Sequence, residues 1–393
     1  MAHENQKYVF SQLLEFLDPY VFLRIAKKYD GDKYVKQFSC WNQLAVMMFG
    51  QLSNRESLRD VVIAVQAHAS KAYRLGFGSS VTRSNLSKAN NNRDYRIFEE
   101  FAYRVVAEAQ KCRATEIFKL GGNVYAFDST TIDLCLSTFE WALFRKTKGG
   151  VKVHTLYDIE TQIPTFFHIT NANVHDSKAM DHIPYEEDSF YIFDRGYNDF
   201  RRLYNIESVG AYFVVRGKKN NDFKAMTWTR RFPAGSTVRS DSCGYLYGQA
   251  TKEKYPDKIR RVIYWDEDNK RKFIFFTNAL DINAETVAML YHQRWQIELF
   301  FKWLKQHLKI KKFWGTTENA VRIQIYSAIT AYCMMAIVQK KMGVERSIYE
   351  MLQIVSISLT DTTTLKDLFA LPDNNIDNEL DGSSEPTLFD CLT

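Results

Sequence analysis

The amino-acid sequence predicts an α/β protein in which a mixed sheet follows an all-helical region, contains a β-rich insertion and precedes further helices. Three changes of pattern support this class. Apolar residues recur at helical spacing as far as about Ala114, alternate with a period of two from Asn123, and return to helical spacing from Ala284. A chain of 393 residues, 46% of them hydrophobic and 25% charged, can bury a sizeable core. Collagen-like, low-complexity and wholly disordered classes are therefore excluded.

The N-terminal region is expected to be entirely helical. Apolar spacing predicts helices over residues 10–29, 41–52 and 58–67. The segment 79–93 is rich in side chains that donate hydrogen bonds to phosphates. It is compatible with a helix-turn-helix reader of DNA, and equally with a solvated loop and helix. The candidate DNA contacts in this segment are Arg83, Asn85, Lys88 and Arg93.

The central region has the composition of strands. β-branched and aromatic runs separated by turn residues predict a three-stranded meander over 124–128, 151–157 and 165–170. A short helix near 176–183 follows. Apolar runs at 190–193 and 211–215 predict two more strands, the first of them buried on both faces. Strands joined partly by hairpins and partly through helices make a sheet of mixed direction.

The remainder of the chain divides into an insertion and a set of helices. Residues 217–283 contain short alternating runs, turn residues and many Lys and Arg side chains, which predicts a β-rich insertion. Helical spacing then predicts one long helix over 284–310, and further helices over 321–342 and 348–369. The last 23 residues hold six acidic residues and no Lys or Arg, so we expect a disordered, solvated tail.

Charge and cysteine usage indicate the compartment and the class of partner. The net charge is +6, and it is +12 without the acidic tail. A basic body suits a polyanionic partner, although a merely soluble surface explains it equally well. The six cysteines lie far apart with no C-x-x-C pair, which disfavours a zinc cluster or a disulfide framework and suits a reducing cytoplasm. The most apolar stretch, 323–338, is shorter than the roughly 20 residues that cross a bilayer, so we expect no membrane span.

Two aspartates follow apolar strands. Asp128 closes the first predicted strand and Asp194 the fourth. Either residue alone would be interpreted as a turn former or a helix cap. A third acidic residue, Glu298, lies in the predicted long helix.

The surroundings of Glu298 make it a stronger candidate. At about 100° per residue, Tyr291, Arg294, Glu298 and Lys305 occupy an arc of roughly 60° on that helix, with Lys302 beside it. The remaining faces are largely apolar, and a carboxylate on such a helix is costly without a purpose. An ordinary ion pair between Arg294 and Glu298 is the alternative.

The spacing Tyr-x2-Arg-x3-Glu-x6-Lys resembles the YREK signature of the hairpin-forming bacterial DDE transposases, insertion-sequence family four. The stretches Ala-Phe-Asp-Ser-Thr at 126–130 and Asp-Arg-Gly-Tyr at 194–197 extend the resemblance, which covers most of the chain to about Met342. It implies an RNase H-like core. In that core the first and fourth strands lie side by side, and the long helix brings Glu298 against Asp128 and Asp194.

The resemblance also implies the chemistry of the site. Three clustered carboxylates are tolerated when divalent cations neutralise them, and oxygen ligands select Mg²⁺ or Mn²⁺ over zinc. Two such ions would support a 3′ nick, hairpin formation, hairpin opening and strand transfer. Tyr291, Arg294 and Lys305, with Lys302 beside them, would hold DNA backbone phosphates.

Three further residues carry weaker expectations. In the family, a tryptophan of the insertion stacks on a flipped base at the hairpin, and Trp265 and Trp228 are the candidates here; each is equally explained as part of a β core. His154 on the second strand is a candidate supporting residue behind the carboxylates, and an ordinary core histidine is the alternative.

The predicted organisation has four parts. They are a helical DNA-end-binding region (1–118), an RNase H-like core in two pieces (119–216 and 284–345), the β-rich insertion (217–283) and a C-terminal helical region with the acidic tail (346–393). The expected partners are the terminal inverted repeats of an element, its target DNA and a second copy of the chain in a synaptic complex, in the bacterial cytoplasm at the nucleoid. The alternatives are a nuclease on the same core that cuts without joining, and a catalytically silent DNA-binding protein.

Overall fold

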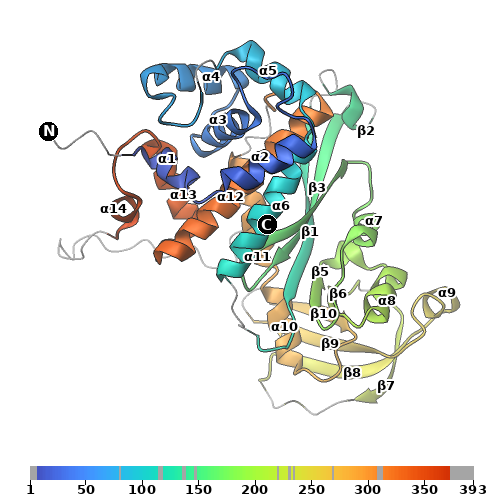
Figure 1. Ribbon diagram of the computed structural model, residues 1–393. Helices are drawn as coiled ribbons and strands as arrows, with labels where there is room; N and C mark the ends of the chain where they lie inside the picture. The colour runs from blue at the N-terminus through green and yellow to red at the C-terminus, as the bar shows by residue number, and fades with distance from the viewer. Residues whose placement is uncertain are drawn as a thin grey trace.

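The computed structural model describes residues 7–78, 81–113, 118–134, 139–145, 148–218, 221–228, 232, 235–267, 270–307 and 313–371. The predicted α/β class is confirmed: one ten-stranded sheet runs through the molecule, and the N-terminal and C-terminal helices gather together at one end (Figure 1). The strands are β1 (Val124–Leu134), β2 (Leu143–Arg145), β3 (Lys148–Asp158), β4 (Ile163–Asn171), β5 (Phe190–Phe193), β6 (Tyr212–Arg216), β7 (Phe223–Trp228), β8 (Val238–Leu246), β9 (Ile259–Asp266) and β10 (Arg271–Thr277). The expected disordered tail lies outside the described residues, apart from Leu371.

The helices agree with the predicted helical regions in most places. The α-helices are α1 (Val9–Leu14), α2 (Pro19–Lys28), α3 (Cys40–Leu52), α4 (Leu58–Ala67), α5 (Arg83–Asn92), α6 (Arg96–Arg113), α7 (Asp176–Ala179), α8 (Phe200–Ser208), α9 (Gln249–Lys252), α10 (Ala284–His292), α11 (Trp295–His307), α12 (Glu318–Met342), α13 (Ile348–Ser358) and α14 (Leu365–Phe369). The short 3₁₀ turns are η1 (Ala69–Lys71), η2 (Glu140–Ala142), η3 (Met180–His182) and η4 (Arg195–Tyr197).

The predicted helix over 10–29 is wrong in its middle, where the chain forms α1 and α2 instead. Asp18 ends the first segment, because its carboxylate accepts hydrogen bonds from the backbone N–H groups of Tyr20 and Val21 and so caps α2. Pro19 occupies the first position of α2, where a missing N–H costs nothing. Other helices begin in the same way, with Ser39 capping α3 and Thr82 capping α5.

The first half of the sheet has the arrangement that the strand pattern predicts. β1 pairs antiparallel with β3, and β3 pairs antiparallel with β4, which confirms the meander. β5 lies parallel to β1 on its other side, and β6 lies parallel to β5. The resulting order β4-β3-β1-β5-β6 is consistent with an RNase H-like domain. All four residues of β5 are buried, as a strand covered on both faces requires.

The region 217–283 is rich in strands as predicted, and its strands continue the same sheet. β10 pairs antiparallel with β6, placing Phe276 opposite Val215, and β9, β8 and β7 follow in order beyond it. A buried ion pair between Arg260 on β9 and Asp241 on β8 fixes this half. Arg260 also donates to the carbonyl groups of Ala279 and Ile282, which tie these strands to the segment leading into α10.

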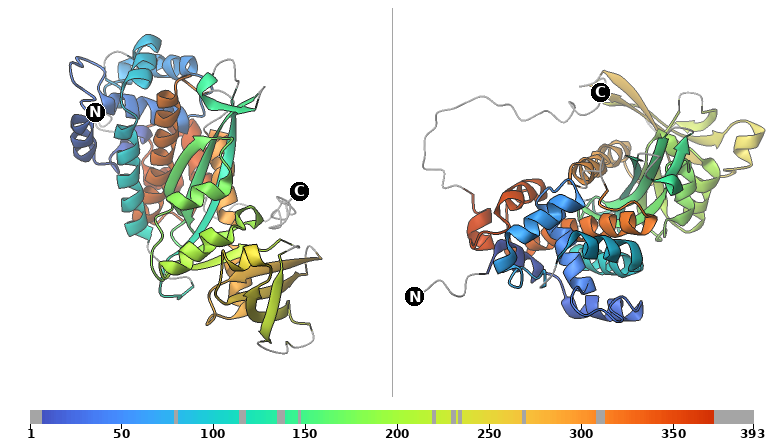
Figure 2. Two further views of the ribbon diagram at one scale, coloured as in Figure 1. Left: turned by 90° about the vertical axis from the view of Figure 1, so that its right-hand side faces the viewer. Right: turned by 90° about the horizontal axis from the view of Figure 1, so that it is seen from above.

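Helices cover the two faces of the first half of the sheet. One face carries α6, α10, α11 and α12, and its core includes Ala126 of β1 with Leu290 and Ile297 of the helices. The other face carries α7 and α8, where Phe127 packs in one core with Leu203 (Figures 1 and 2). Side chains of β1 therefore alternate between two different helical layers.

α12 is the one helix among the described residues that is long and apolar enough to cross a membrane. Its apolar window is 94% buried inside the molecule, against α3, α5, α6 and α13. Burial to this extent is typical of a core helix. Thr317 caps its beginning, and Gly343, with a φ of +64°, ends it in the left-handed conformation.

Candidate active site

The parallel pairing of β1 and β5 brings Asp128 and Asp194 together. Phe127 is the register partner of Phe193, and each phenylalanine is followed by one of the two aspartates. Asp194 leaves β5 to begin the η4 turn. Asp128 does not end its strand as predicted, because β1 continues its pairing with β3 as far as Leu134. It lies instead at the point where the neighbouring strand β5 ends.

The predicted single helix over 284–310 is wrong: within the described residues it is divided into α10 and α11. The backbone tightens at the joint, where the N–H of Arg294 donates to the carbonyl of Tyr291 and the N–H of Ile297 donates to the carbonyl of Arg294. These bonds span three residues, as in a 3₁₀ turn, and such a turn inside a helix is typical of a functional site. Tyr291 therefore lies on α10, Arg294 at the joint and Glu298 in the first turn of α11.

Arg294 connects two of the three carboxylates. One terminal nitrogen of its guanidinium donates to Oδ2 of Asp128 at 2.8 Å, and the other donates to Oε1 of Glu298. The arginine side chain is 12% exposed, whereas those of Asp128 and Glu298 are 23% and 36% exposed. The ordinary helix ion pair considered as an alternative is thus present, and Arg294 reaches Asp128 as well.

Asp194 has its own partners. The hydroxyl of Tyr291 donates to its Oδ1 at 2.8 Å, and the guanidinium of Arg216 at the end of β6 lies 3.8 Å from the same oxygen. The hydroxyl of Tyr197 on η4 lies 3.5 Å from Oδ1 of Asp128. Arg294 thus joins Asp128 to Glu298 and Tyr291 bonds Asp194, so two residues of the YREK pattern contact all three carboxylates.

Burial and mutual repulsion perturb these carboxyl groups. Burial raises the pKa of Asp128 to about 6; Arg294 counteracts this, and the charges of Asp194 and Glu298 add to it. Burial also acts to raise the pKa of Asp194, but the backbone N–H of Arg195 and the charge of Arg294 outweigh it and leave that pKa below its ordinary value. Asp128 thus gains more than Asp194 from a further cation.

The remaining predicted DNA contacts differ in accessibility. Lys302 and Lys305 on α11, and Arg83, Asn85 and Lys88 on α5, are exposed. Arg93 is not: its side chain is 9% exposed, and its guanidinium donates to the carbonyl groups of Phe38 and Ser39 and to the Gln43 side chain. Arg93 holds the end of α5 against α3, so its donors are bonded within the fold and not presented to solvent. α4 and α5 are separated by 15 residues, which is too long for a tight helix-turn-helix joint, whereas α5 and α6 are separated by three.

The three weaker candidates lie in or behind the sheet. Trp265 on β9 is partly buried, and its backbone pairs with Lys272. Trp228 ends β7, and its side chain lies outside the described part of the chain. His154 on β3 is fully buried and bonds Thr170 through Nε2 at 3.0 Å. Its register partner is Ser129, so it faces the side of the sheet opposite to Asp128.

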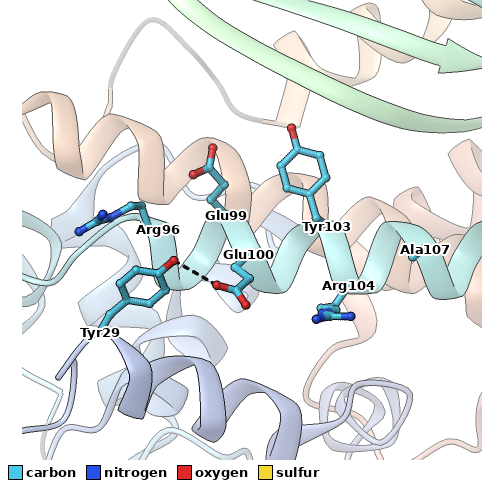
Figure 3. A pocket seen from close by; sticks show the side chains of 7 residues that line it. All are labelled: Tyr29, Arg96, Glu99, Glu100, Tyr103, Arg104 and Ala107. Atoms are coloured by element: carbon cyan, nitrogen blue, oxygen red, sulfur yellow. Dashed lines mark hydrogen bonds between the residues drawn. The ribbon is translucent and has the colours of Figure 1, made fainter. Parts of the chain in front are cut away.

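Several residues of the site have no signal in the sequence pattern. Arg216 and Tyr197 reach the aspartates because β5, η4 and β6 converge there. Nothing in the spacing of Arg216 indicates this position, and Tyr197, although it ends the Asp-Arg-Gly-Tyr stretch, is given no role by the sequence. A separate pocket of about 410 Å³ opens between α2 and α6 (Figure 3). In it the Tyr29 hydroxyl donates to Glu100 at 3.1 Å, and the pocket shares no residue with the carboxylate site.

Comparison with known proteins identifies the family of this fold and site. Residues 119–334, which contain all three carboxylates, match the transposase DDE domain. The chain belongs to the DDE transposase family. Residues 5–78 match a domain of unknown function, DUF4372.

Three relatives carry transposase names. A Sinorhizobium fredii protein named as a transposase is 37% identical over 213 residues, which are 53% of this chain and 59% of that protein. A Geobacillus stearothermophilus protein named for insertion sequence element IS5377 is 28% identical over 64% of this chain and 66% of its own length. A Synechocystis protein named for insertion sequence element IS4SA is 29% identical over 66% of this chain and 72% of its own length. The chain thus spans less than two thirds of the first two relatives.

Membership of the DDE family implies dependence on divalent metal ions. Among the residues that the structure describes, no group of three or more His, Cys, Asp or Glu side chains stands close enough to hold a metal ion. The donor set nevertheless fits one. Asp128, Asp194 and Glu298 offer oxygen ligands that are partly exposed, and burial together with like charge makes a cation favourable beside Asp128. Arg294 supplies positive charge at this place and would have to release a carboxylate to admit the metal.

Proposed function

We propose that the protein is the transposase of an insertion sequence and that it cuts and joins DNA at Asp128, Asp194 and Glu298. One observation carries this proposal: the three acidic residues converge from β1, the end of β5 and α11 within a stretch that matches the transposase DDE domain. The sequence resemblance to the YREK group of insertion-sequence family four supports the finer assignment, cut-and-paste transposition through a hairpin intermediate.

Each residue of the site has a role in this proposal. Two Mg²⁺ or Mn²⁺ ions bound there would activate the attacking oxygen and stabilise the leaving oxygen at phosphorus. Asp128, Asp194 and Glu298 would hold these ions through their carboxylate oxygens. Arg294 and Tyr291, released from the carboxylates, hold DNA phosphates close to the cut. Lys302 and Lys305, exposed further along α11, extend the contact along the backbone.

The helical region 1–118 is proposed to bind the element ends. Its support is the exposed side of α5, where Arg83, Asn85 and Lys88 present donors to solvent. Trp265 and Trp228 are the candidates to stack on a flipped base, and the side chain of Trp265 is partly exposed on β9. The proposal includes a homodimer on paired ends, acting on DNA in the bacterial cytoplasm.

The test is an assay of the purified protein with Mg²⁺ and labelled DNA that carries the terminal inverted repeats of its element. We expect nicked, hairpin and joined products to accumulate in that order. Nicks alone would identify a nuclease on the same core, and a gel shift without any product would identify a silent DNA-binding protein. Either result would contradict the proposed transposase activity.

A further inference from the structure

A network of polar side chains lies on the face of β1 opposite to the carboxylates. Ser129 follows Asp128 directly, and its side chain points to the α7 side of the sheet. Its hydroxyl donates to Oδ1 of Asp176, the first residue of α7, at 2.7 Å. The ammonium group of Lys152 on β3 lies 3.0 Å from the same carboxylate oxygen.

Two buried side chains, Lys152 and His154, complete the network. Lys152 is 8% exposed, and it donates a second hydrogen bond to the backbone carbonyl of Val174 at 2.9 Å. His154 is fully buried beside it, with Nδ1 3.9 Å from Oδ1 of Asp176. Burying an ammonium group costs several kcal/mol unless it is paired and hydrogen-bonded, so this arrangement fixes Asp176 in one place. A fixed Asp176 in turn fixes the Ser129 hydroxyl.

Ser129 passes this constraint to the active site. Its backbone N–H donates to Oδ1 of Asp128 at 2.8 Å, so one residue holds Asp176 through its side chain and Asp128 through its backbone. These contacts of Ser129 lie at the point where β1 loses one neighbouring strand. The pairing of β1 with β5 ends at Phe127, and from Asp128 onwards β1 pairs, among the described strands, with β3 alone.

We propose that Asp176, anchored by Lys152, positions Asp128 for metal binding through Ser129. This inference rests on the proposed function, because it assumes that Asp128 is a metal ligand. Asp176 itself touches no reacting atom; it is a positioning residue on the far face of the sheet. Supporting partners of this kind change metal affinity by about tenfold to hundredfold when they are removed.

The matched control is Asp181, five residues further along the same segment. Asp181 on η3 is ion-paired with Arg202 at 2.7 Å, as Asp176 is with Lys152, but Arg202 lies on α8, whereas Lys152 lies on β3, the strand paired with β1. Asp176→Asn and Asp181→Asn therefore each remove one charged member of an ion pair, and only the first lies in the path to Asp128. A second pair, Ser129→Ala and Ser129→Thr, removes or keeps the hydroxyl link without changing any charge.

The experiment measures Mn²⁺ binding to the DNA-free full-length protein by electron paramagnetic resonance, with thermal unfolding as the check on folding. We expect Asp176→Asn and Ser129→Ala to weaken Mn²⁺ binding by about tenfold or more, and Asp181→Asn and Ser129→Thr to bind like the wild type. If Ser129→Ala bound Mn²⁺ normally, the positioning proposal would be overturned, and any effect of Asp176→Asn would be that of its charge alone. Equal weakening by Asp176→Asn and Asp181→Asn would overturn it too.

The same titration separates this proposal from the proposed function. Asp128→Asn should abolish Mn²⁺ binding at the site whatever the role of Asp176. Unchanged binding in Asp128→Asn would refute the metal site itself, whereas loss in Asp128→Asn with normal binding in Ser129→Ala would refute only the positioning role.

Discussion

The two faces of β1 around Asp128 hold similar ion pairs in different surroundings. On one face Arg294 joins Asp128 to Glu298, and the two carboxylates are 23% and 36% exposed. On the other face Lys152 holds Asp176; the lysine side chain is 11% exposed, the carboxylate is 37% exposed, and His154 is fully buried beside them. Exposure is therefore similar on the two faces, and the partners differ. Arg294 is shared by two carboxylates that repel each other, so this ion pair can exchange partners. Asp176 is held by both an ammonium group and a hydroxyl, so this ion pair keeps its partners.

This difference shows how one strand can carry carboxylates that exchange their partners on one face and fixed supporting contacts on the other. Where two carboxylates share one cation, a metal ion can replace that cation and free it for a DNA phosphate, because like charges that lie close together favour further positive charge. Where one carboxylate is held by a buried ammonium group and a hydroxyl, breaking the pair leaves an uncompensated charge. Variants on the Asp128 side should therefore alter chemistry and ligand binding, and those on the Asp176 side should alter geometry and stability.

The largest effect is expected from the three carboxylates. Asp128→Asn, Asp194→Asn and Glu298→Gln keep the shape of each side chain and remove its charge, so each should lower the rate of DNA cleavage by at least about 10³-fold, the loss expected when several kcal/mol of metal-assisted stabilisation disappears. Binding of element ends should persist, since removing negative charge does not weaken phosphate contacts. Cleavage time courses and gel shifts on the same preparations measure both. Near-normal cleavage by any one variant would remove that residue from the site.

Arg294 provides the sharper test of exchange on the Asp128 side of β1. If the guanidinium competes with a metal for Asp128 and Glu298, then Arg294→Gln should bind Mn²⁺ more tightly in the absence of DNA. A hydrogen bond to a charged group is worth about 1.5–3 kcal/mol, which corresponds to roughly tenfold to hundredfold in affinity. Without metal the variant should also unfold at a lower temperature, because two carboxylates lose their cation.

The matched control for Arg294 is Arg202→Gln. Arg202 likewise bridges two carboxylates, those of Asp181 and Asp199, but it does so on α8, and its loss should leave Mn²⁺ affinity unchanged. Unaltered or weaker Mn²⁺ binding by Arg294→Gln would show that the arginine does not compete for the site. The proposed exchange of partners on the Asp128 side of β1 would then be refuted.

Sequence reasoning located the carboxylates because each depends on local pattern. The aspartates follow apolar runs, and the spacing around Glu298 is that of one helix face. Sequence reasoning did not locate the contacts that depend on which helices and strands pack together. Asp176 reaches Ser129 only because α7 folds back over β1, and Lys152 joins it through the β1–β3 register, which places it opposite Thr131.

The fold was predictable to a similar extent. Strand composition predicts the existence of β10 but not its pairing with β6, because register and partner choice are set by packing across the whole sheet. The break between α10 and α11 has no proline or glycine to indicate it. It coincides with Arg294, whose two carboxylate partners come from β1 and α11.

The smallest effect concerns stability on the Asp176 side of β1, where His154 is fully buried. Burial lowers the pKa of His154 to about 3, with Asp176 opposing the shift and Lys152 adding to it. In the unfolded chain a histidine titrates near 6.5. His154 is therefore neutral in the folded protein, and its contribution to stability is complete above pH 6.5 and is lost as the pH falls from 6.5 towards 3. At pH 5.5, one unit below the unfolded value, the loss is about 1.4 kcal/mol.

His154→Gln removes this titration and keeps a polar group beside Thr170. The variant should be less stable than the wild type at pH 7.5, because ring packing against Phe127 is lost, but the difference in unfolding free energy should narrow by about 1.4 kcal/mol at pH 5.5. Denaturant unfolding of both proteins at the two pH values measures the change. Parallel stability curves for wild type and His154→Gln would mean that the histidine is not held neutral, and the side of β1 that faces α7 would then be as open to protons and solvent as the side that carries Asp128.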